Sequence, residues 1–235
     1  AGGSADRRAC DGCPPPRLRR PCPRPDPAPR TATPPGLDNL LWVLTFTVLG
    51  AGLMGTLGLI APGFDPGPGL TTPDPVSLAE SLAGLARAGI TRVAMEASSH
   101  GLDQFRLDGA SLAAGAFTNL TRDHLDYHGT IAAYRQAKLR LFEVLLVDGG
   151  TAVIDVDHEY SDAVVAVAQK RNVTLFTVGA KGQGITLVST TIDGFTQALV
   201  LKHEGKRYDV RLPLVGAFQV ENALVASGLV IATGG

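Results

Sequence analysis

Short apolar segments alternate with amphipathic segments between residues 71 and 179, and this alternation limits the possible folds more than any other feature. Helical patterns cover residues 71–89, 130–146 and 158–171, and strand-like patterns cover residues 91–97, 112–120, 151–155 and 173–179. Strands that alternate with helices are typical of a parallel sheet that is covered on both faces. We therefore predict an α/β fold with a mostly parallel sheet flanked by helices.

The clearest helix signals lie within residues 71–89. Asp74 is a candidate N-cap, Pro75 suits the first helical position, and Gly89 suits the position just past the end. These three residues predict a helix that begins at Pro75 and ends shortly before Gly89.

The pattern changes after residue 184. Residues 185–192, 196–203 and 206–214 alternate as antiparallel strands do, and the sequence EGK at 204–206 suits a hairpin turn. A last amphipathic segment at 218–232 predicts a closing helix. We expect a few antiparallel strands after residue 184, followed by this helix.

The first segment, residues 1–36, is rich in Pro and Arg and poor in aliphatic residues. Such a composition cannot bury enough apolar surface to offset the entropy of ordering the chain, so we interpret 1–36 as disordered or miscoded. Residues 37–235 are then expected to form one domain. Three cysteines lie in the first segment without a fourth ligand close by, which disfavours a zinc site there.

Residues 40–61 carry no charged side chain and allow three interpretations. A buried strand and loop of an α/β core is the favoured one. A transmembrane helix is the second, because the length suffices. The third is a dinucleotide-binding motif through Gly50, Gly52 and Gly55, although the following residues do not predict the helix that this motif requires.

Composition excludes some functional classes. The net charge is −1 and no basic stripe is interleaved with aromatic residues, so we expect no nucleic-acid partner. The odd number of cysteines argues against a disulfide framework, and no signal peptide is recognisable. A cytoplasmic, monomeric protein without stable membrane insertion is expected.

Three predicted loops are rich in polar residues, and they begin at Thr71, Glu96 and Asn119. Ligands of open parallel sheets bind outside the carboxyl ends of the strands. A structural alternative is that these residues only cap helices and solvate loops. Since three loops converge at one edge, we favour a binding site there.

Lys138 lies in the apolar stripe of the helix at 130–146, between Tyr134 and Leu141. Periodicity alone favours a lysine whose stem covers the core while its ammonium group reaches water. A desolvated lysine could instead react with carbon dioxide to form a carbamate. With Glu96 at a strand end and His124 in the next loop, such an anion could hold magnesium beside a phosphate.

Several stretches, in this order, resemble the Mur ligase family: MGTLG, LTTPDP, VAMEASSHGLDQFRL, FTNLTRDHLDYHGT, YRQAKLRLF and NALVASGL. The similarity spans about residues 53–234 and covers the central, ATPase-type domain of that family, whose fold is related to that of P-loop proteins. It implies ATP-dependent amide ligation in peptidoglycan precursor synthesis. The glutamate carboxylate of UDP-MurNAc-L-Ala-D-Glu is activated as an acyl phosphate, and a diamino acid, here expected to be meso-diaminopimelate, attacks it.

The resemblance also implies the site residues. Glu96 and His124 match the magnesium ligands of the family, and Lys138 matches its carbamylated lysine, which implies that these three residues are catalytic. The implied ligands of the UDP-linked dipeptide are Thr71, Thr72, Ser98, Gln104 and Arg106. Asn222 matches an asparagine near the nucleotide, so ATP and Mg²⁺ are the expected cofactors.

The sequence also departs from the family. No lysine precedes Lys138, so the phosphate-binding loop G-x-x-G-K-[ST] is missing. We expect the N-terminal uridine-binding domain and the C-terminal amino-acid-binding domain of the family to be absent as well. Gln219 stands where the family commonly has Asn. We therefore expect this chain alone to be inactive, and the alternative function is a non-catalytic module that binds the UDP-MurNAc-dipeptide.

Overall fold

The computed structural model describes residues 51–64, 69–120 and 124–235, all within one compact unit, Gly36–Gly235. The helices are α2 Pro75–Arg87, α3 Ser99–Asp103, α4 Leu125–His128, α5 Ile131–Arg140, the π-helical turn η1 Leu141–Leu145, α6 Ser161–Ala168 and α7 Ala217–Ala232. The strands are β1 Ala51–Gly55, β2 Gly58–Ile60, β3 Arg92–Met95, β4 Leu112–Phe117, β5 Leu146–Asp155, β6 Thr174–Gly179, β7 Ile185–Asp193, β8 Thr196–His203 and β9 Lys206–Leu212.

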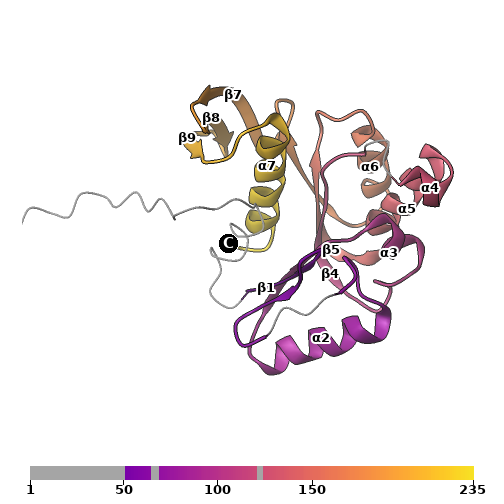
Figure 1. Ribbon diagram of the computed structural model, residues 1–235. Helices are drawn as coiled ribbons and strands as arrows, with labels where there is room; N and C mark the ends of the chain where they lie inside the picture. The colour runs from indigo at the N-terminus through magenta and orange to yellow at the C-terminus, as the bar shows by residue number, and fades with distance from the viewer. Residues whose placement is uncertain (1–50, 65–68, 121–123) are drawn as a thin grey trace, which may run out of the picture. The chain divides into compact units, whose positions relative to one another are not determined.

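The described strands form two sheets (Figure 1). The smaller sheet has the order β2-β1-β3, with β1 parallel to β3 and antiparallel to β2. The larger sheet has the order β4-β5-β6-β7-β8-β9, parallel from β4 to β7 and antiparallel from β7 to β9. The prediction of a mostly parallel sheet with antiparallel strands after residue 184 is confirmed. The division into two sheets was not predicted, because sequence alternation does not show which strands are neighbours.

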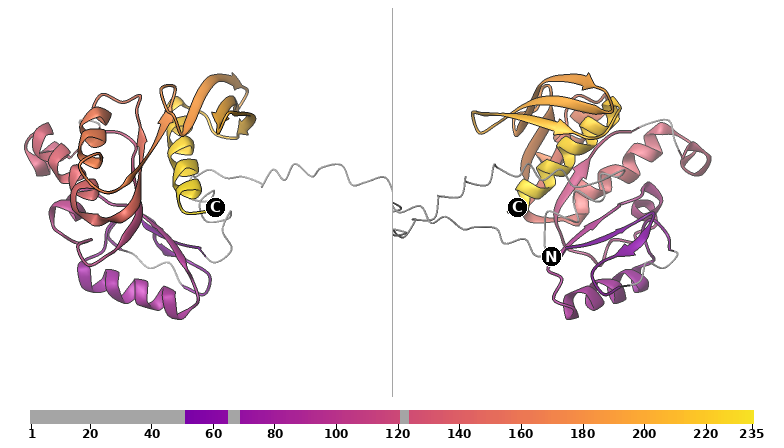
Figure 2. Two further views of the ribbon diagram at one scale, coloured as in Figure 1. Left: turned by 180° about the vertical axis from the view of Figure 1, so that it is seen from behind. Right: turned by 60° about the vertical axis from the view of Figure 1, so that its left-hand side comes forward.

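The second half of strand β5 is buried on both faces. Ala152 and Ile154 pack in the cluster that includes residues of α6, whereas Val153 packs in the cluster that includes residues of α7. Successive side chains of a strand point to opposite faces, so the apolar run AVI supplies both clusters. Figures 1 and 2 accordingly show α7 on one side of β5 and α6 on the other.

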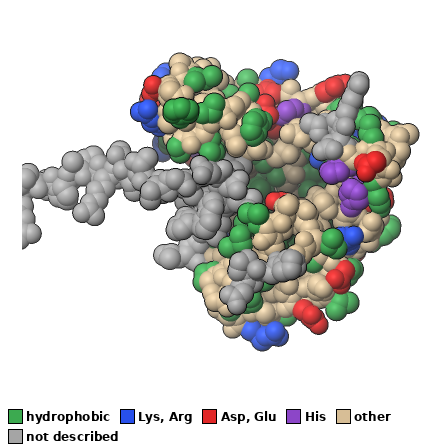
Figure 3. All heavy atoms as spheres, in the orientation of Figure 1, with side chains coloured by type: hydrophobic (Ala, Val, Ile, Leu, Met, Phe, Trp, Pro, Cys, Tyr) green, Lys and Arg blue, Asp and Glu red, His purple; other side chains and the backbone are tan. Residues whose placement is uncertain are grey.

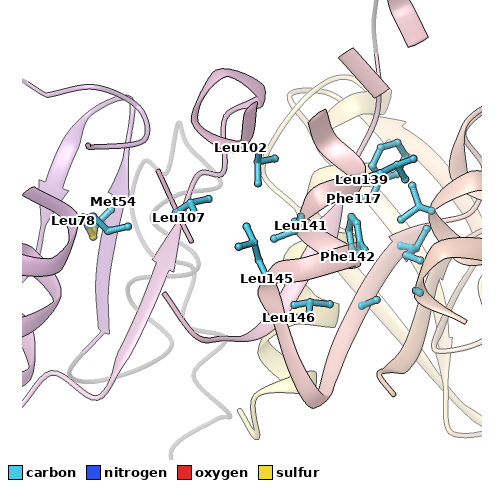
Figure 4. Close-up of a cluster of buried hydrophobic side chains, with 14 of the residues drawn as sticks. Met54, Leu78, Leu102, Leu107, Phe117, Leu139, Leu141, Phe142, Leu145 and Leu146 are labelled. Carbon is cyan, nitrogen blue, oxygen red and sulfur yellow. The ribbon is translucent and has the colours of Figure 1, made fainter. Parts of the chain in front are cut away.

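One hydrophobic cluster continues from the smaller sheet to the larger one (Figure 4). Met54 of β1 and Leu78 of α2 lie at one end, and Leu107 lies beside β3 in the view. Leu141 and Leu145 of η1 extend the cluster toward the larger sheet. Residues of both sheets thus share one core.

Helix α2 has the predicted ends. The Asp74 carboxylate accepts hydrogen bonds from the Val76 and Ser77 amides at 3.0 and 3.1 Å, and Pro75 begins the helix. Gly89 follows with φ +78°, a left-handed conformation that glycine adopts without strain. The hydrogen bonds from Ser77 lower the pKa of Asp74.

The predicted hairpin turn at 204–206 is also confirmed. Glu204 and Gly205 connect β8 to β9 with φ values of +48° and +75°. Positive φ at both central positions matches the right-handed twist of the flanking strands. The closing helix α7 begins one residue before its predicted start.

The helix predicted at 130–146 differs in detail. It begins at Ile131 with Thr130 as its N-cap, becomes a π-helical turn at Leu141, and gives way to β5 at Leu146. Tyr134, Leu141 and Leu145 are buried and Lys138 is partly buried, as the stripe predicted. The short helix α4, which precedes Gly129, was not predicted.

The described part of residues 40–61 favours the core interpretation. Residues 51–60 form β1 and β2, and β1 is buried throughout. Gly52 and Gly55 lie in β1 and a strand follows them, so the dinucleotide-motif interpretation was wrong; Gly50 lies outside the described residues. In the part of the chain that the structure describes, no helix is long and apolar enough to cross a membrane. The interpretation of residues 1–36 lies outside the described residues.

Candidate active site

An open cavity of about 590 Å³ lies where the loops after β3 and β4 meet. Its lining residues are Thr56, Leu70, Thr71, Thr72, Glu96, Ala97, Ser98, Ser99, His100, Arg106, His124, Tyr134 and Lys138. Figure 3 shows histidine side chains gathered beside a hollow in this face. The volume lies in the range of small-molecule sites in proteins.

Thr72 holds two of the converging loops together. Its hydroxyl donates a hydrogen bond to the Glu96 carbonyl at 2.8 Å, accepts one from the Ser98 amide at 2.9 Å, and lies 2.9 Å from the Ser98 hydroxyl. Thr72 is almost fully buried, so these bonds satisfy a hydroxyl that would otherwise be costly to bury. A Cβ on Gly101 would lie 2.6 Å from the Thr72 side chain, so only glycine allows this close approach.

The Glu96 carboxylate is positioned by Thr56. Glu96 Oε2 accepts hydrogen bonds from the Thr56 hydroxyl at 2.8 Å and from its amide at 3.3 Å. A Cβ on Gly55 would come within 2.7 Å of Glu96 Cδ, so the glycine leaves room for the carboxylate. The carboxylate therefore lies at the end of β3 with one oxygen fixed.

Arg106 connects the Thr72 loop to α3. Its Nη1 donates to the Thr72 carbonyl at 2.8 Å, and its Nε donates to Gln104 Oε1 at 3.0 Å. Gln104 donates in turn to the Tyr127 hydroxyl at 3.0 Å. The preceding residue, Phe105, has φ +58°, a conformation that costs a bulky residue on the order of 1–3 kcal/mol and that is found most often at functional sites. The guanidinium is thus held in one orientation at the cavity wall.

The Lys138 side chain lies in the lining of the cavity. Its Nζ donates a hydrogen bond to the Asn119 carbonyl at 3.0 Å and lies 5.1 Å from the centroid of the Tyr134 ring. Helix α5 presents the amine, while the stem packs beside the buried Tyr134. This geometry places an amine among the other lining groups, as both interpretations of Lys138 allow.

Three histidines and two tyrosines form a ring cluster at one end of the cavity. His100 lies 5.1 Å from His124 and 4.0 Å from Tyr127 between ring centroids, and His128 stacks on Tyr134 at 5.2 Å. His124 has φ +57°, a left-handed conformation that histidine adopts more often than most residues. Burial lowers the pKa of His128 below its usual 6.5, and the neighbouring His100 and His124 lower it further.

The lowered pKa of His128 predicts that acid destabilises the fold. Below the ordinary pKa of 6.5 the unfolded chain binds a proton that the folded chain resists, so the free energy of unfolding falls as pH falls. His128→Gln keeps a neutral polar side chain and is expected to lose less stability than the parent protein between about pH 7.5 and 5.5. Urea unfolding at both pH values measures this, with His203→Gln as the control outside the cluster. Equal losses in parent and His128→Gln would contradict the prediction.

Most residues that the sequence predicted line this one cavity: Thr71, Thr72, Glu96, Ser98, Arg106, His124 and Lys138. Gln104 is not among the lining residues, but it accepts a hydrogen bond from Arg106, which is. Asn222 lies in α7 and is not among the lining residues. Sequence reasoning assigned no role to Thr56, although its place in MGTLG, next to a glycine in a predicted buried strand, was a usable signal.

A family model supports the assignment of the fold. The model described as Mur ligase middle domain matches residues 40–230. This chain belongs to the Mur ligase family.

Three curated relatives carry the name UDP-N-acetylmuramoyl-L-alanyl-D-glutamate–2,6-diaminopimelate ligase. The relative from Bradyrhizobium diazoefficiens is 52% identical over 185 residues, covering 77% of this chain and 38% of the relative. The relative from a Chelativorans species is 53% identical over 186 residues, with 79% and 38% covered. The one from Zymomonas mobilis is 49% identical over 199 residues, with 85% and 40% covered. The chain thus spans about two fifths of the length of the curated relatives it matches.

Solved structures agree with the fold. A structure of a ligase with the same name has a TM-score of 0.71 and 32% identity, covering 82% of this chain and 39% of that one. The apo form of L. casei FPGS has a TM-score of 0.55 at 15% identity, with 82% and 54% covered, and shows similarity of fold alone.

Proposed function

We propose that this chain is the central domain of an ATP-dependent amide ligase that joins meso-diaminopimelate to UDP-MurNAc-L-Ala-D-Glu in peptidoglycan precursor synthesis. The observation that carries the proposal is the convergence of seven residues matching the family's site on one cavity. The names of the relatives support the substrates, including diaminopimelate rather than lysine. The glutamate carboxylate would take a phosphoryl group from ATP and leave ADP, and the amine would then attack the acyl phosphate and displace phosphate.

The cavity would hold the anionic, glutamyl end of the dipeptide. Arg106 has N–H donors beyond those used by Thr72 and Gln104, and a planar guanidinium suits a carboxylate. Ser98 is the N-cap of α3, and its amide and hydroxyl both hydrogen-bond with Thr72 at the cavity wall. Thr71 lies within 3.2 Å of Thr56 between hydroxyl oxygens, so a hydroxyl pair borders the same space. Gln104 would act by positioning Arg106.

The donor set suits magnesium. Glu96 offers a carboxylate oxygen, which Mg²⁺ prefers, and its position is fixed by Thr56. We propose that Glu96, His124 and Lys138 as a carbamate hold Mg²⁺, and that Asn222 lies near the nucleotide. Bound there, the ion would offset negative charge on the phosphates and the acyl phosphate.

Carbamylation of Lys138 is directly testable. The amine donates a hydrogen bond to the Asn119 carbonyl and lies in the lining of the cavity that Glu96 and His124 also line. Protein equilibrated with ¹³C-bicarbonate is expected to show a carbamate carbonyl resonance that Lys138→Arg abolishes. Lys170→Arg, at an exposed position two residues past the end of α6, is the matched control and should keep the resonance. A spectrum without the resonance, or one that Lys138→Arg leaves unchanged, would count against a carbamate.

Titration calorimetry with UDP-MurNAc-L-Ala-D-Glu, with and without ATP and Mg²⁺, tests the function. The phosphate-binding loop of the family is not recognisable in the sequence, so we propose that the chain binds the dipeptide but does not turn over ATP by itself. Dipeptide binding that ATP never changes would support a non-catalytic module instead. Absence of any dipeptide binding would contradict the proposal, and formation of ADP on mixing with ATP would contradict the expected inactivity.

We further propose a monomer in the cytoplasm, where the UDP-linked substrates of the relatives and ATP occur together. Light scattering at several protein concentrations tests the first part, and a mass of two chains would contradict it. Fractionation of cells tests the second part.

A further inference from the structure

A second group of metal-binding side chains lies outside the cavity described above. Asp155 ends β5, His158 follows three residues later, and Glu221 projects from α7. One ligand atom from each residue lies within 4.8 Å of the other two. None of these residues lines the cavity around Lys138.

Asp155 is the unusual member, because its side chain is only 1% exposed. Oδ1 accepts a hydrogen bond from the Asp157 amide at 3.0 Å, whereas Oδ2 has no hydrogen-bond partner among the described residues. A buried carboxylate oxygen without a partner is costly, and native structures usually satisfy it with a donor, a water or a metal ion. Burial accordingly raises the pKa of Asp155, and the carboxylates of Asp157 and Glu221 also raise it.

The unpartnered oxygen points toward His158. His158 Nε2 lies 3.6 Å from Asp155 Oδ2 and 3.3 Å from Glu221 Oε2, and it too has no hydrogen-bond partner among the described residues. Two ligand atoms of a tetrahedral metal ion are roughly 3.4 Å apart, given bond lengths of about 2.1 Å. The two distances to Nε2 therefore match a shared ion without large movement.

The surrounding backbone fixes these side chains. The Asp157 amide orients the Asp155 carboxylate, and the Ser161 hydroxyl donates to the His158 carbonyl at 2.8 Å. Ser161 is buried, so the turn that carries His158 is anchored in the core. Partners that orient metal ligands in this way strengthen metal sites. His158 and Glu221 are partly exposed, which gives an ion access from solvent.

We propose that Asp155, His158 and Glu221 form a second metal site, which takes a first-row transition-metal dication such as Zn²⁺. An imidazole with two carboxylates suits zinc and its first-row neighbours, which bind nitrogen and oxygen ligands alike. A dication would offset the carboxylates of Asp155 and Glu221 and provide the partner that Asp155 Oδ2 lacks. This inference goes beyond the proposed ligase function and does not depend on it.

Imidazole ¹⁵N spectra of the full chain during titration with Zn²⁺ test the proposal. The chain has five histidines, so each ring can be assigned by substitution and followed separately from any zinc bound elsewhere. The three cysteines are replaced by serine in every sample, because they would compete for zinc. We expect the Nε2 resonance of His158 to shift with zinc, and the melting temperature to rise.

Glu221→Gln removes one ligand at a partly exposed position and should require at least about ten-fold more zinc for the His158 shift. Glu159→Gln, an exposed neighbour outside the group, should behave like the parent protein. Asp155→Asn is the second variant; it keeps the acceptor for the Asp157 amide and should also weaken the shift. A His158 Nε2 resonance that zinc leaves unchanged would overturn the proposal, and so would equal shifts in the parent, Glu221→Gln and Asp155→Asn proteins.

Discussion

Replacing Arg106 with lysine is expected to weaken binding of UDP-MurNAc-L-Ala-D-Glu by about ten- to a hundred-fold. The guanidinium donates to the Thr72 carbonyl and to Gln104 at the same time. The remaining N–H groups of its planar array are available to a substrate carboxylate. Lysine keeps the charge but carries a compact ammonium group that cannot reproduce this planar arrangement. A charge-assisted hydrogen bond is worth roughly 1.5–3 kcal/mol, which sets the size of the effect.

Calorimetry with the parent, Arg106→Lys and Arg87→Lys proteins measures this difference. Arg87 is exposed in the last turn of α2, so Arg87→Lys makes the same change of side chain away from the cavity. Melting temperatures of all three proteins distinguish a lost contact from a lost fold. Equal affinities for the parent and Arg106→Lys proteins would show that Arg106 does not bind the substrate.

Replacing Phe142 with alanine is expected to lower the free energy of unfolding by about 3–5 kcal/mol. Phe142 lies in the π-helical turn η1 and is 1% exposed, within the cluster that joins the two sheets (Figure 4). The deletion removes most of a buried aromatic side chain and leaves a cavity that the packed surroundings fill only in part. Since domains are stable by about 5–15 kcal/mol, this one change removes a large share of the stability.

Val144→Ala is the matched control, because Val144 lies in the same turn and is 53% exposed. Its effect should stay within about 0.5 kcal/mol. Urea unfolding followed by circular dichroism gives both values. If Phe142→Ala and Val144→Ala unfold at the same urea concentration, Phe142 is not the core residue that the structure indicates.

Local signals predicted much of the fold. Asp74, Pro75 and Gly89 set the ends of α2 because each residue has a distinct backbone preference. The turn at Glu204 and Gly205 followed from its residue types and the strands around it. Such features depend on few neighbouring residues and are therefore visible in a sequence.

Other features depend on residues far apart in the chain. Helices α3 and α4 contain five and four residues, too few for a hydrophobic period, so their segments read as loops. The division into two sheets follows from strand pairing, which no single segment encodes.

The location of the candidate site was predicted better than the contacts between its residues. Three polar loops at strand ends predicted a site at this place, and seven of the predicted residues line one cavity there. The bond between Thr56 and Glu96 joins residues forty positions apart, and Glu221 reaches His158 only because α7 packs against β5 and β6. These contacts are made by tertiary packing, so sequence alone could not supply them.

A crystal structure of the chain with UDP-MurNAc-L-Ala-D-Glu tests the central claim most directly. We expect the glutamyl carboxylate in the cavity, with the Arg106 guanidinium and Ser98 within hydrogen-bond distance. Density for the dipeptide at any other place on the protein, with this cavity empty, would contradict the assignment of the site.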